Sequence, residues 1–231
     1  MSSDNEIAQM KNPKLETLSS LEILDLSNNS LQLFSLANHP SLIELDLSKN
    51  SLMSFDAEDL PYLIHLNLSI NTLQHLKLTG LSSLADLNLS SNNLTEFVNV
   101  SLPDLTNLDF SNNQLENFSL NNLSSLVSLN LSRNSFTSFS FDLLSSSNES
   151  LEVVDLSFNR LSKFVILSDD FANASFVLRY LNLREMFTKD VMFIPFKTLF
   201  LHSLNSKQFN FYKRILIRFA DKLQYFYLNI H

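Results

Sequence analysis

The sequence predicts an elongated, mostly strand solenoid with a parallel sheet on its concave side and extended segments or turns on its convex side. Two observations predict this fold class. The template Leu-x-x-Leu-x-Leu-x-x-Asn-x-Leu occurs seven times, and the first six copies begin 21 residues apart. A fixed period of this length is typical of stacked units rather than of a closed globule. The copies begin at Leu21, Leu42, Leu63, Leu84, Leu105, Leu126 and Leu151.

The front half of each copy has the pattern of a strand. In the copy that begins at Leu105, the apolar residues Leu108 and Phe110 alternate with the polar residues Asp109 and Ser111. Such alternation indicates a strand with one face buried. One strand per copy, stacked in register, predicts a parallel sheet with neighbours about 4.8 Å apart.

The ninth template position is always asparagine. A buried turn leaves backbone groups without partners, and an amide side chain has both donors and acceptors to satisfy them. Each such bond contributes about 1 kcal/mol net, whereas an unpaired buried group costs about 1–3 kcal/mol. We therefore expect a structural ladder, not catalytic or glycan-bearing residues, at Asn29, Asn50, Asn71, Asn92, Asn113, Asn134 and Asn159.

The outer half of each copy begins with a large apolar residue, thirteen positions after the start. Only about eight residues remain for the outer side, which is too short for an ordinary stable helix. Extended segments or turns are expected there. The aromatic residues recur at the repeat spacing and should form a core spine rather than a ligand pocket. The positions are Phe34, Phe55, Leu76, Phe97, Phe118, Phe139 and Phe164.

Three segments follow from these patterns. Residues 1–20 read as a partial repeat or an improvised N-terminal cap, because Leu15 and Leu18 fall at outer-half positions of a preceding unit. Residues 21–184 form the solenoid, with seven clear repeats and one degenerate repeat. A chain that begins in mid-repeat could also be part of a longer protein, and an uncapped end could support self-association.

Residues 185–231 form a non-repeat, basic and aromatic tail. Its segment 211–226 has interleaved charge and could be an amphipathic helix that caps the last strand. Two alternatives stay open: a helix that binds a membrane surface or a partner, and a tail that is not a native cap.

The seven copies, with five fixed positions in one register, resemble the leucine-rich repeat family over roughly residues 8–184. The 21-residue unit resembles the class with short extended convex segments. The resemblance implies an α/β-type, mostly β, leucine-rich repeat solenoid: a curved right-handed superhelix. It also implies protein binding on the concave sheet, without catalysis or cofactors. The chain departs from the family in having no cysteine, and therefore no cysteine-clustered caps.

Composition narrows the partner and the compartment. The net charge is −8, and residues 1–184 hold 9 Lys+Arg against 21 Asp+Glu, so the repeat region is a poor nucleic-acid binder. No apolar stretch reaches the roughly 18 residues of a membrane span. Without a secretory signal or cysteine, the chain as written is predicted to be cytoplasmic. It would be extracellular if it is a fragment of a receptor.

Template positions three, five, seven and eight are expected to face the concave solvent. Positions five (Asp or Asn) and seven (Ser) are uniform, which indicates a role in the scaffold or in solubility. A specific site should therefore use the variable positions three and eight. Exposed apolar side chains can anchor an interface, although single exposed apolar side chains are common on protein surfaces and do not by themselves indicate a binding site. The candidate partner-binding residues are Glu44, Lys49, His65, Ile70, Asp86, Asn107, Arg133 and Phe158.

Other chemistry is set aside. Glu44, His65 and Asp86 form an acidic stripe with one histidine, but carboxylates on a flat, wet sheet lack the pocket that catalysis needs. No metal or catalytic site is predicted. Ten Asn-x-Ser/Thr sequons occur, and most are read as byproducts of the repeat consensus.

The leading hypothesis is a non-enzymatic scaffold that recognises a partner protein, of basic or mixed surface, on its concave face. The alternative is a fragment of a leucine-rich repeat receptor ectodomain.

Overall fold

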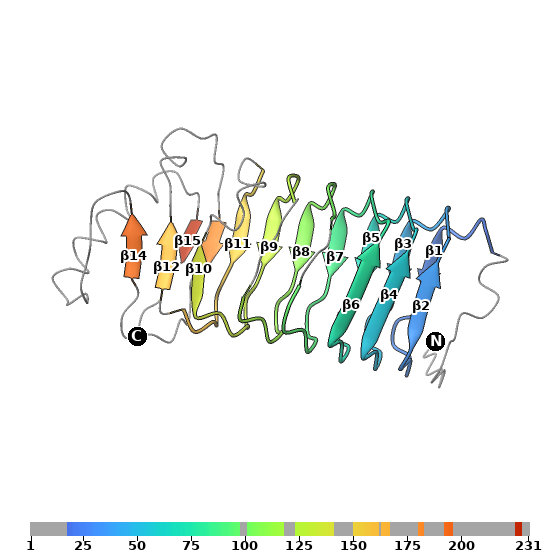
Figure 1. Ribbon diagram of the computed structural model, residues 1–231, viewed down its shortest axis with the longest axis horizontal. Coiled ribbons are helices and arrows are strands. Elements are labelled where there is room, and N and C mark those ends of the chain that lie inside the picture. The colour runs from blue at the N-terminus through green and yellow to red at the C-terminus, as the bar shows by residue number, and fades with distance from the viewer. Residues whose placement is uncertain are drawn as a thin grey trace.

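The chain folds into a solenoid of strands and turns (Figure 1). The computed structural model describes residues 18–97, 101–117, 123–140, 150–161, 163–166, 180–182, 192–195 and 225–227. Its main sheet has nine strands in the order β1-β3-β5-β7-β8-β9-β11-β13-β15, and every adjacent pair is parallel. The strands are β1 (Ile23–Asp25), β3 (Glu44–Asp46), β5 (His65–Asn67), β7 (Asp86–Asn88), β8 (Asn107–Asp109), β9 (Ser128–Asn130), β11 (Val153–Asp155), β13 (Tyr180–Asn182) and β15 (Tyr225–Tyr227).

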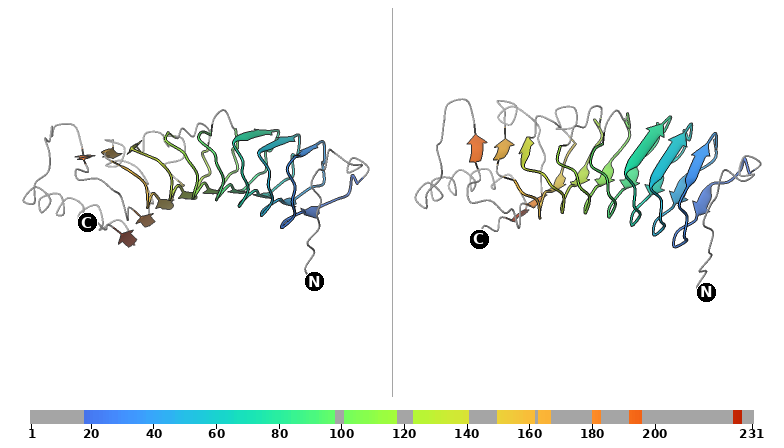
Figure 2. Two further views of the ribbon diagram at one scale, coloured as in Figure 1. Left: turned by 90° about the horizontal axis from the view of Figure 1, so that it is seen from below. Right: turned by 60° about the horizontal axis from the view of Figure 1, so that its bottom comes forward.

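The nine-stranded sheet lies along the inner side of a curved body (Figure 2). From β1 to β11 each strand occupies template positions three to five. The leucine at position four therefore pairs in register with its counterpart, as Leu45 does with Leu66. These side chains point inward and are at most 2% exposed from Leu45 to Leu129. The solenoid and its concave parallel sheet are confirmed.

The convex side is built from strands and turns within the described residues. One three-stranded parallel sheet contains β2 (Phe34–Ala37), β4 (Ser54–Glu58) and β6 (His75–Thr79), and another contains β10 (Ser138–Ser140), β12 (Lys163–Ile166) and β14 (Met192–Pro195). The predicted extended convex segments are confirmed. The rings of Phe34 and Phe55 stack with centroids 6.3 Å apart. Phe97 and Phe139 are also buried, whereas the side chains of Phe118 and Phe164 lie outside the described part.

The only glycine of the chain lies in a convex turn. Asn38, Asp59 and Gly80 occupy equivalent positions 21 residues apart, and all three have positive φ. A Cβ atom at Gly80 would lie 2.6 Å from Asp59 Oδ1. Both the left-handed backbone and the close neighbour therefore favour glycine at this position.

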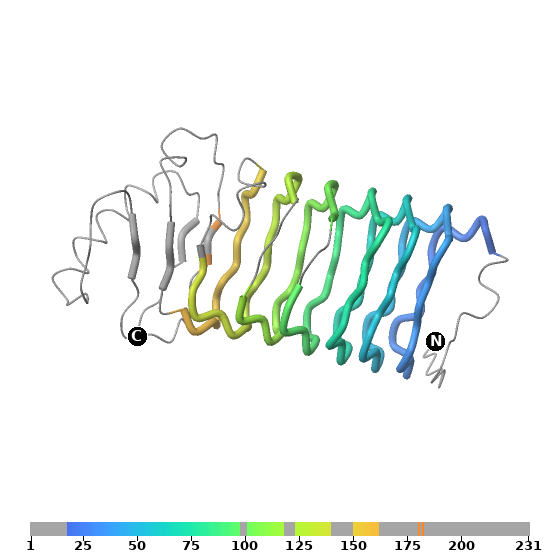
Figure 3. Tube along the Cα trace, in the orientation of Figure 1, coloured from blue at the N-terminus to red at the C-terminus, as the bar shows by residue number. Residues whose placement is uncertain are grey.

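The C-terminal tail contributes strands to both sides of the solenoid. β14 pairs with β12, and β15 pairs with β13. Residues 225 and 226 were expected in a capping helix but lie in β15, where aromatic residues with high strand propensity meet the free edge of β13. Residues 211–224 of that expected helix lie outside the described residues, as do residues 1–17. Figure 3 traces the described coils in sequence order.

Candidate functional site: the concave groove

The turn that follows each inner strand is held by the asparagine at position nine. In the fourth repeat, Asn92 Nδ2 donates to the Leu68 carbonyl of the preceding coil at 2.9 Å and to the Leu89 carbonyl of its own coil at 3.0 Å. Asn92 Oδ1 accepts the backbone N–H of Leu73 at 3.0 Å. Each amide thus joins two coils. The same contacts recur at Asn50, Asn71, Asn113, Asn134 and Asn159.

The first asparagine differs from the others. Asn29 Nδ2 donates only within its own coil, to the carbonyls of Leu26 and Ser27. Its Oδ1 is buried and has no hydrogen-bond partner. Leu21, Leu24 and Leu26 of the same coil are partly buried, whereas their counterparts in the second coil are fully buried. Within the described residues, which begin at 18, no preceding coil packs against the first coil as one does against every interior coil.

Position five also has a structural role. Each Asp or Asn at this position accepts the backbone N–H of the serine two residues later, as Asp46 does from Ser48 at 2.8 Å. Amides at position five also donate across the coils, for example Asn67 to Asp46 at 3.0 Å. The hydroxyl of Ser27, and then its N–H, lower the pKa of the Asp25 carboxyl. Position seven was expected to face solvent, but this prediction is wrong for four of its serines, which are buried. They are Ser48, Ser69, Ser132 and Ser157.

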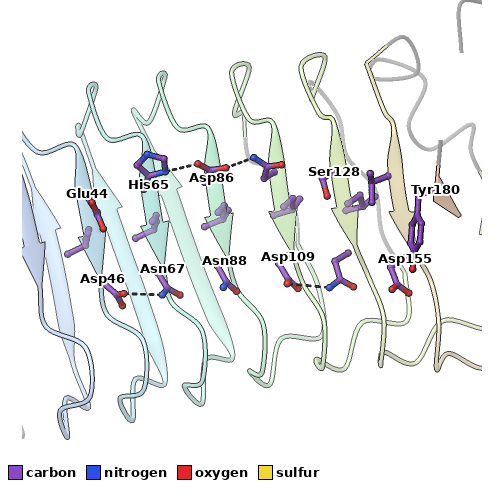
Figure 4. Close-up of a pocket in the computed structure, with 18 residues that line it drawn as sticks. Glu44, Asp46, His65, Asn67, Asp86, Asn88, Asp109, Ser128, Asp155 and Tyr180 are labelled. Atoms are coloured by element: carbon purple, nitrogen blue, oxygen red, sulfur yellow. Dashed lines mark hydrogen bonds and ion pairs between the residues drawn. The ribbon is translucent and has the colours of Figure 1, made fainter. Parts of the chain in front are cut away.

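Positions three and five together line an open groove of about 550 Å³ that runs across the strands from β3 to β13 (Figure 4). Five carboxylates line the groove, and its lining contains no lysine or arginine. It contains one histidine, His65. The carboxylates are Glu44, Asp46, Asp86, Asp109 and Asp155. The groove therefore presents a negative surface to solvent, because carboxylates are ionised at neutral pH.

Asp86 is the centre of a polar chain along the groove. His65 Nδ1 lies 2.6 Å from Asp86 Oδ2, and Asn107 Nδ2 donates to Asp86 Oδ1. The side chains of His65 and Asp86 are 51% and 38% exposed, so their pairing stabilises the fold by at most about 1 kcal/mol. No hydrogen bond or ion pair engages the Glu44 carboxylate within the described residues. The pairing orients groove side chains more than it stabilises the solenoid.

Position eight lies in the turn and outside the groove lining. All seven residues there have positive φ, between 54° and 58°. Most residues at this position are polar, but Ile70 is β-branched and half exposed, which makes its left-handed backbone a genuine outlier. The Arg133 guanidinium lies 4.3 Å from the centroid of the Phe158 ring in the next coil. Sequence reasoning missed this backbone requirement, although Asn28 and Asn112 in the same column hinted at it.

The structure thus divides the eight candidate residues into two groups. Glu44, His65, Asp86 and Asn107 share the groove. The other four, Lys49, Ile70, Arg133 and Phe158, lie in the turns beyond its lining.

Sequence reasoning did not select Ser128, Val153 or Tyr180, which complete the position-three row in the groove. Their place in the repeat was the available signal, because Val153 is the third residue of the copy that begins at Leu151, and Tyr180 is the third residue of the degenerate repeat that begins at Leu178.

Other ligand chemistry finds no support in the described ranges. There, no group of three or more His, Cys, Asp or Glu side chains is arranged to hold a metal ion. The same ranges contain no helix of the length and apolarity that a membrane crossing requires.

Comparisons with known proteins agree with this architecture. The family model described as Leucine Rich Repeat matches residues 20–39 and 125–147. No curated protein matches the chain. Among solved structures, TLR13 in a complex with ssRNA13 is 25% identical over 79% of this chain, with a TM-score of 0.60. A leucine-rich repeat protein of Leptospira interrogans is 25% identical over 84%, also with a TM-score of 0.60.

The Toll receptor of Drosophila, in its complex with Spatzle, shares the fold at 20% identity over 82% of the chain, with a TM-score of 0.63. The chain covers 28%, 49% and 28% of the lengths of these three structures, respectively. The template, the solenoid and these matches show that the chain is built from leucine-rich repeats, with a 21-residue unit and short extended convex segments. Members of this family are in general non-catalytic binding scaffolds.

Proposed function

We propose that the chain binds a partner protein on its concave face, and that the groove between β3 and β13 is the contact surface. The observation that carries this proposal is the charge of the groove: five carboxylates, and no lysine or arginine, line one continuous hollow. A surface of this kind attracts a positively charged partner surface and repels an acidic one. Catalysis plays no part in the proposed function.

The side chains at positions nine and five bond to the backbone of the turns, whereas the position-three side chain of Glu44 makes no such bond within the described residues. Glu44 and His65 are exposed and contribute little to stability. Side chains that vary from coil to coil on a regular sheet are suited to recognition, because they change the surface without changing the scaffold. The position-three row is therefore the part of the groove that should select the partner.

Affinity capture with three forms of the chain tests the proposal. The first is the unaltered chain, and the second carries Glu44→Lys and Asp86→Lys. The third carries Glu58→Lys and Glu116→Lys, two exposed glutamates outside the groove, as a charge-matched control. A protein retained by the first and third forms but lost by the second supports the proposal. Equal retention by the second form, or equal loss by both variants, contradicts it.

A second candidate is ligand recognition as part of a receptor ectodomain. The similarity to TLR13, at 25% identity over 79% of the chain, favours it. The TLR13 structure contains RNA, but no lysine or arginine lines the groove of this chain to meet phosphates. A protein ligand is therefore the form of this candidate that the groove supports. Nuclease treatment of the captured material separates the two: persistence of capture fits a protein, and its loss fits RNA.

A further inference from the structure

The position-three row changes its chemistry along the groove. Its pairing runs from Glu44 through His65 and Asp86 to Asn107, Ser128, Val153 and Tyr180. The β3–β7 end is charged, the middle is neutral and polar, and the β11–β13 end carries an aliphatic and an aromatic side chain. Figure 4 shows Glu44 and His65 near one end of this hollow and Tyr180 at the other. In the position-three row the groove therefore has two unlike ends, whereas the position-five carboxylates, from Asp46 to Asp155, recur along it (Figure 4).

We infer that the groove binds an extended polypeptide segment that carries a cationic side chain and, further along the same face, an apolar one. This inference rests on the proposed function and names the chemistry of the partner. At the charged end, the Glu44 carboxylate has no partner among the described residues, so a lysine or arginine can pair with it. At the other end, Val153 and Tyr180 are partly exposed and adjacent in register.

The strand spacing gives the distance between the two contacts. His65 is at the centre of the charged end, and it lies four coils from Val153 and five from Tyr180. At about 4.8 Å per coil, the two ends are about 22 Å apart, and an extended chain covers that distance in about six residues. Side chains about six positions apart point to the same side of an extended chain, because its period is two. Both contacts can therefore be made at once.

Synthetic peptides test this geometry directly. One peptide has an arginine pair and a leucine pair whose centres are about six residues apart, in a background of serine and threonine. A second has the same composition with the leucines next to the arginines, and a third has no leucine. We expect the spaced peptide to bind the whole chain about tenfold more tightly than the other two. Fluorescence anisotropy measures the affinities.

Two variants assign the contacts. Val153→Thr should remove the advantage of the spaced peptide and leave the affinity for the leucine-free peptide unchanged. Ile64→Thr is the matched control, because Ile64 is an exposed aliphatic residue outside the groove lining, and it should change neither affinity. Glu44→Gln should weaken all three peptides. Thermal unfolding of each variant checks that the solenoid remains folded.

Several outcomes would overturn the inference. They are equal affinity for the spaced and adjacent peptides, an advantage that survives Val153→Thr, or no binding of any peptide. The capture experiment judges the proposed function separately, because it tests charge alone. If arginine peptides bind whatever the place of leucine, and the Glu44 and Asp86 reversals abolish capture, the proposed function stands and the two-ended groove falls.

Discussion

Two rows of side chains on the same coils differ in almost every respect. The ladder row, from Asn50 to Asn159, is uniform and bonded to the backbone of two coils, and most of its members are buried. The position-three row in the groove varies from glutamate to tyrosine and is at least partly exposed. The comparison shows that the residue type is constant where the side chain bonds to the backbone of the coils, and that it varies where the side chain makes no such bond.

The largest effect should come from an interior member of the ladder row. Asn92→Ala removes three donated bonds and one accepted bond, and it leaves four backbone groups of its own and the preceding coil to find other partners. With about 1 kcal/mol for each lost bond, we expect a loss of about 4 kcal/mol in the free energy of unfolding. Urea unfolding followed by circular dichroism measures it.

Asn29→Ala is the control for that experiment. Asn29 makes bonds only within its own coil, and its Oδ1 has no partner. At the same value for each bond, the loss should be about 2 kcal/mol. Similar losses at Asn29 and Asn92 would contradict the conclusion that the ladder stabilises the fold by joining coils.

Position five should behave like the ladder and unlike position three on the same strand. Asp46 accepts the N–H of the buried Ser48 and the amide of Asn67. Asp46→Ala should therefore lower the free energy of unfolding by about 1–2 kcal/mol. Glu44→Ala, two residues earlier, should change it by less than about 0.5 kcal/mol. Equal effects would remove the distinction between the two rows.

The sequence was sufficient to predict the solenoid and its sheets, because both depend on short-range periodicity. Leucine at position four, as in Leu66, and asparagine at position nine, as in Asn71, have the same neighbours in every interior coil. The prediction was therefore accurate wherever the period holds. One of the alternatives for the tail, a capping helix over residues 211–226, is wrong at residues 225 and 226, because charge alternation in an aperiodic tail does not reveal the free edge of β13.

The candidate site was predicted only in part. Position three was expected to face the concave solvent, and Glu44, His65 and Asp86 do line the groove. Position eight was expected there as well, but its residues lie outside the groove lining. The cause is the left-handed backbone that the turn requires. This requirement is set by the geometry of the coil and leaves little trace in residue choice, since Lys49, Ile70 and Phe158 all accept it.

The position-eight column provides a test in the stabilising direction. Ile70 combines a φ of 55° with a β-branched side chain that is half exposed, so it bears the strain of the turn and gains little from burial. Asparagine tolerates this conformation better, and Ile70→Asn should raise the free energy of unfolding by about 1 kcal/mol. The reverse exchange at the equivalent position, Asn28→Ile, should lower it. A loss of stability in Ile70→Asn would show that the isoleucine packs better than its exposure indicates.

The smallest expected effect is a change in the pKa of one carboxyl, that of Asp25 in the first coil. Bonds from the Ser27 hydroxyl and N–H lower the pKa of Asp25. A carboxyl whose folded pKa lies below its unfolded value stabilises the fold above the unfolded pKa, and this contribution is lost as the pH falls through the folded pKa. Ser27→Ala removes the hydroxyl donor and keeps the N–H, so the pKa of Asp25 should rise but not return fully to its ordinary value. Carboxyl carbon shifts in an NMR titration report the change in the pKa of Asp25.

The free energy of unfolding at low pH should change little, because Asp25 is exposed to solvent. An unchanged pKa would mean that the backbone bond alone lowers the pKa of this carboxyl.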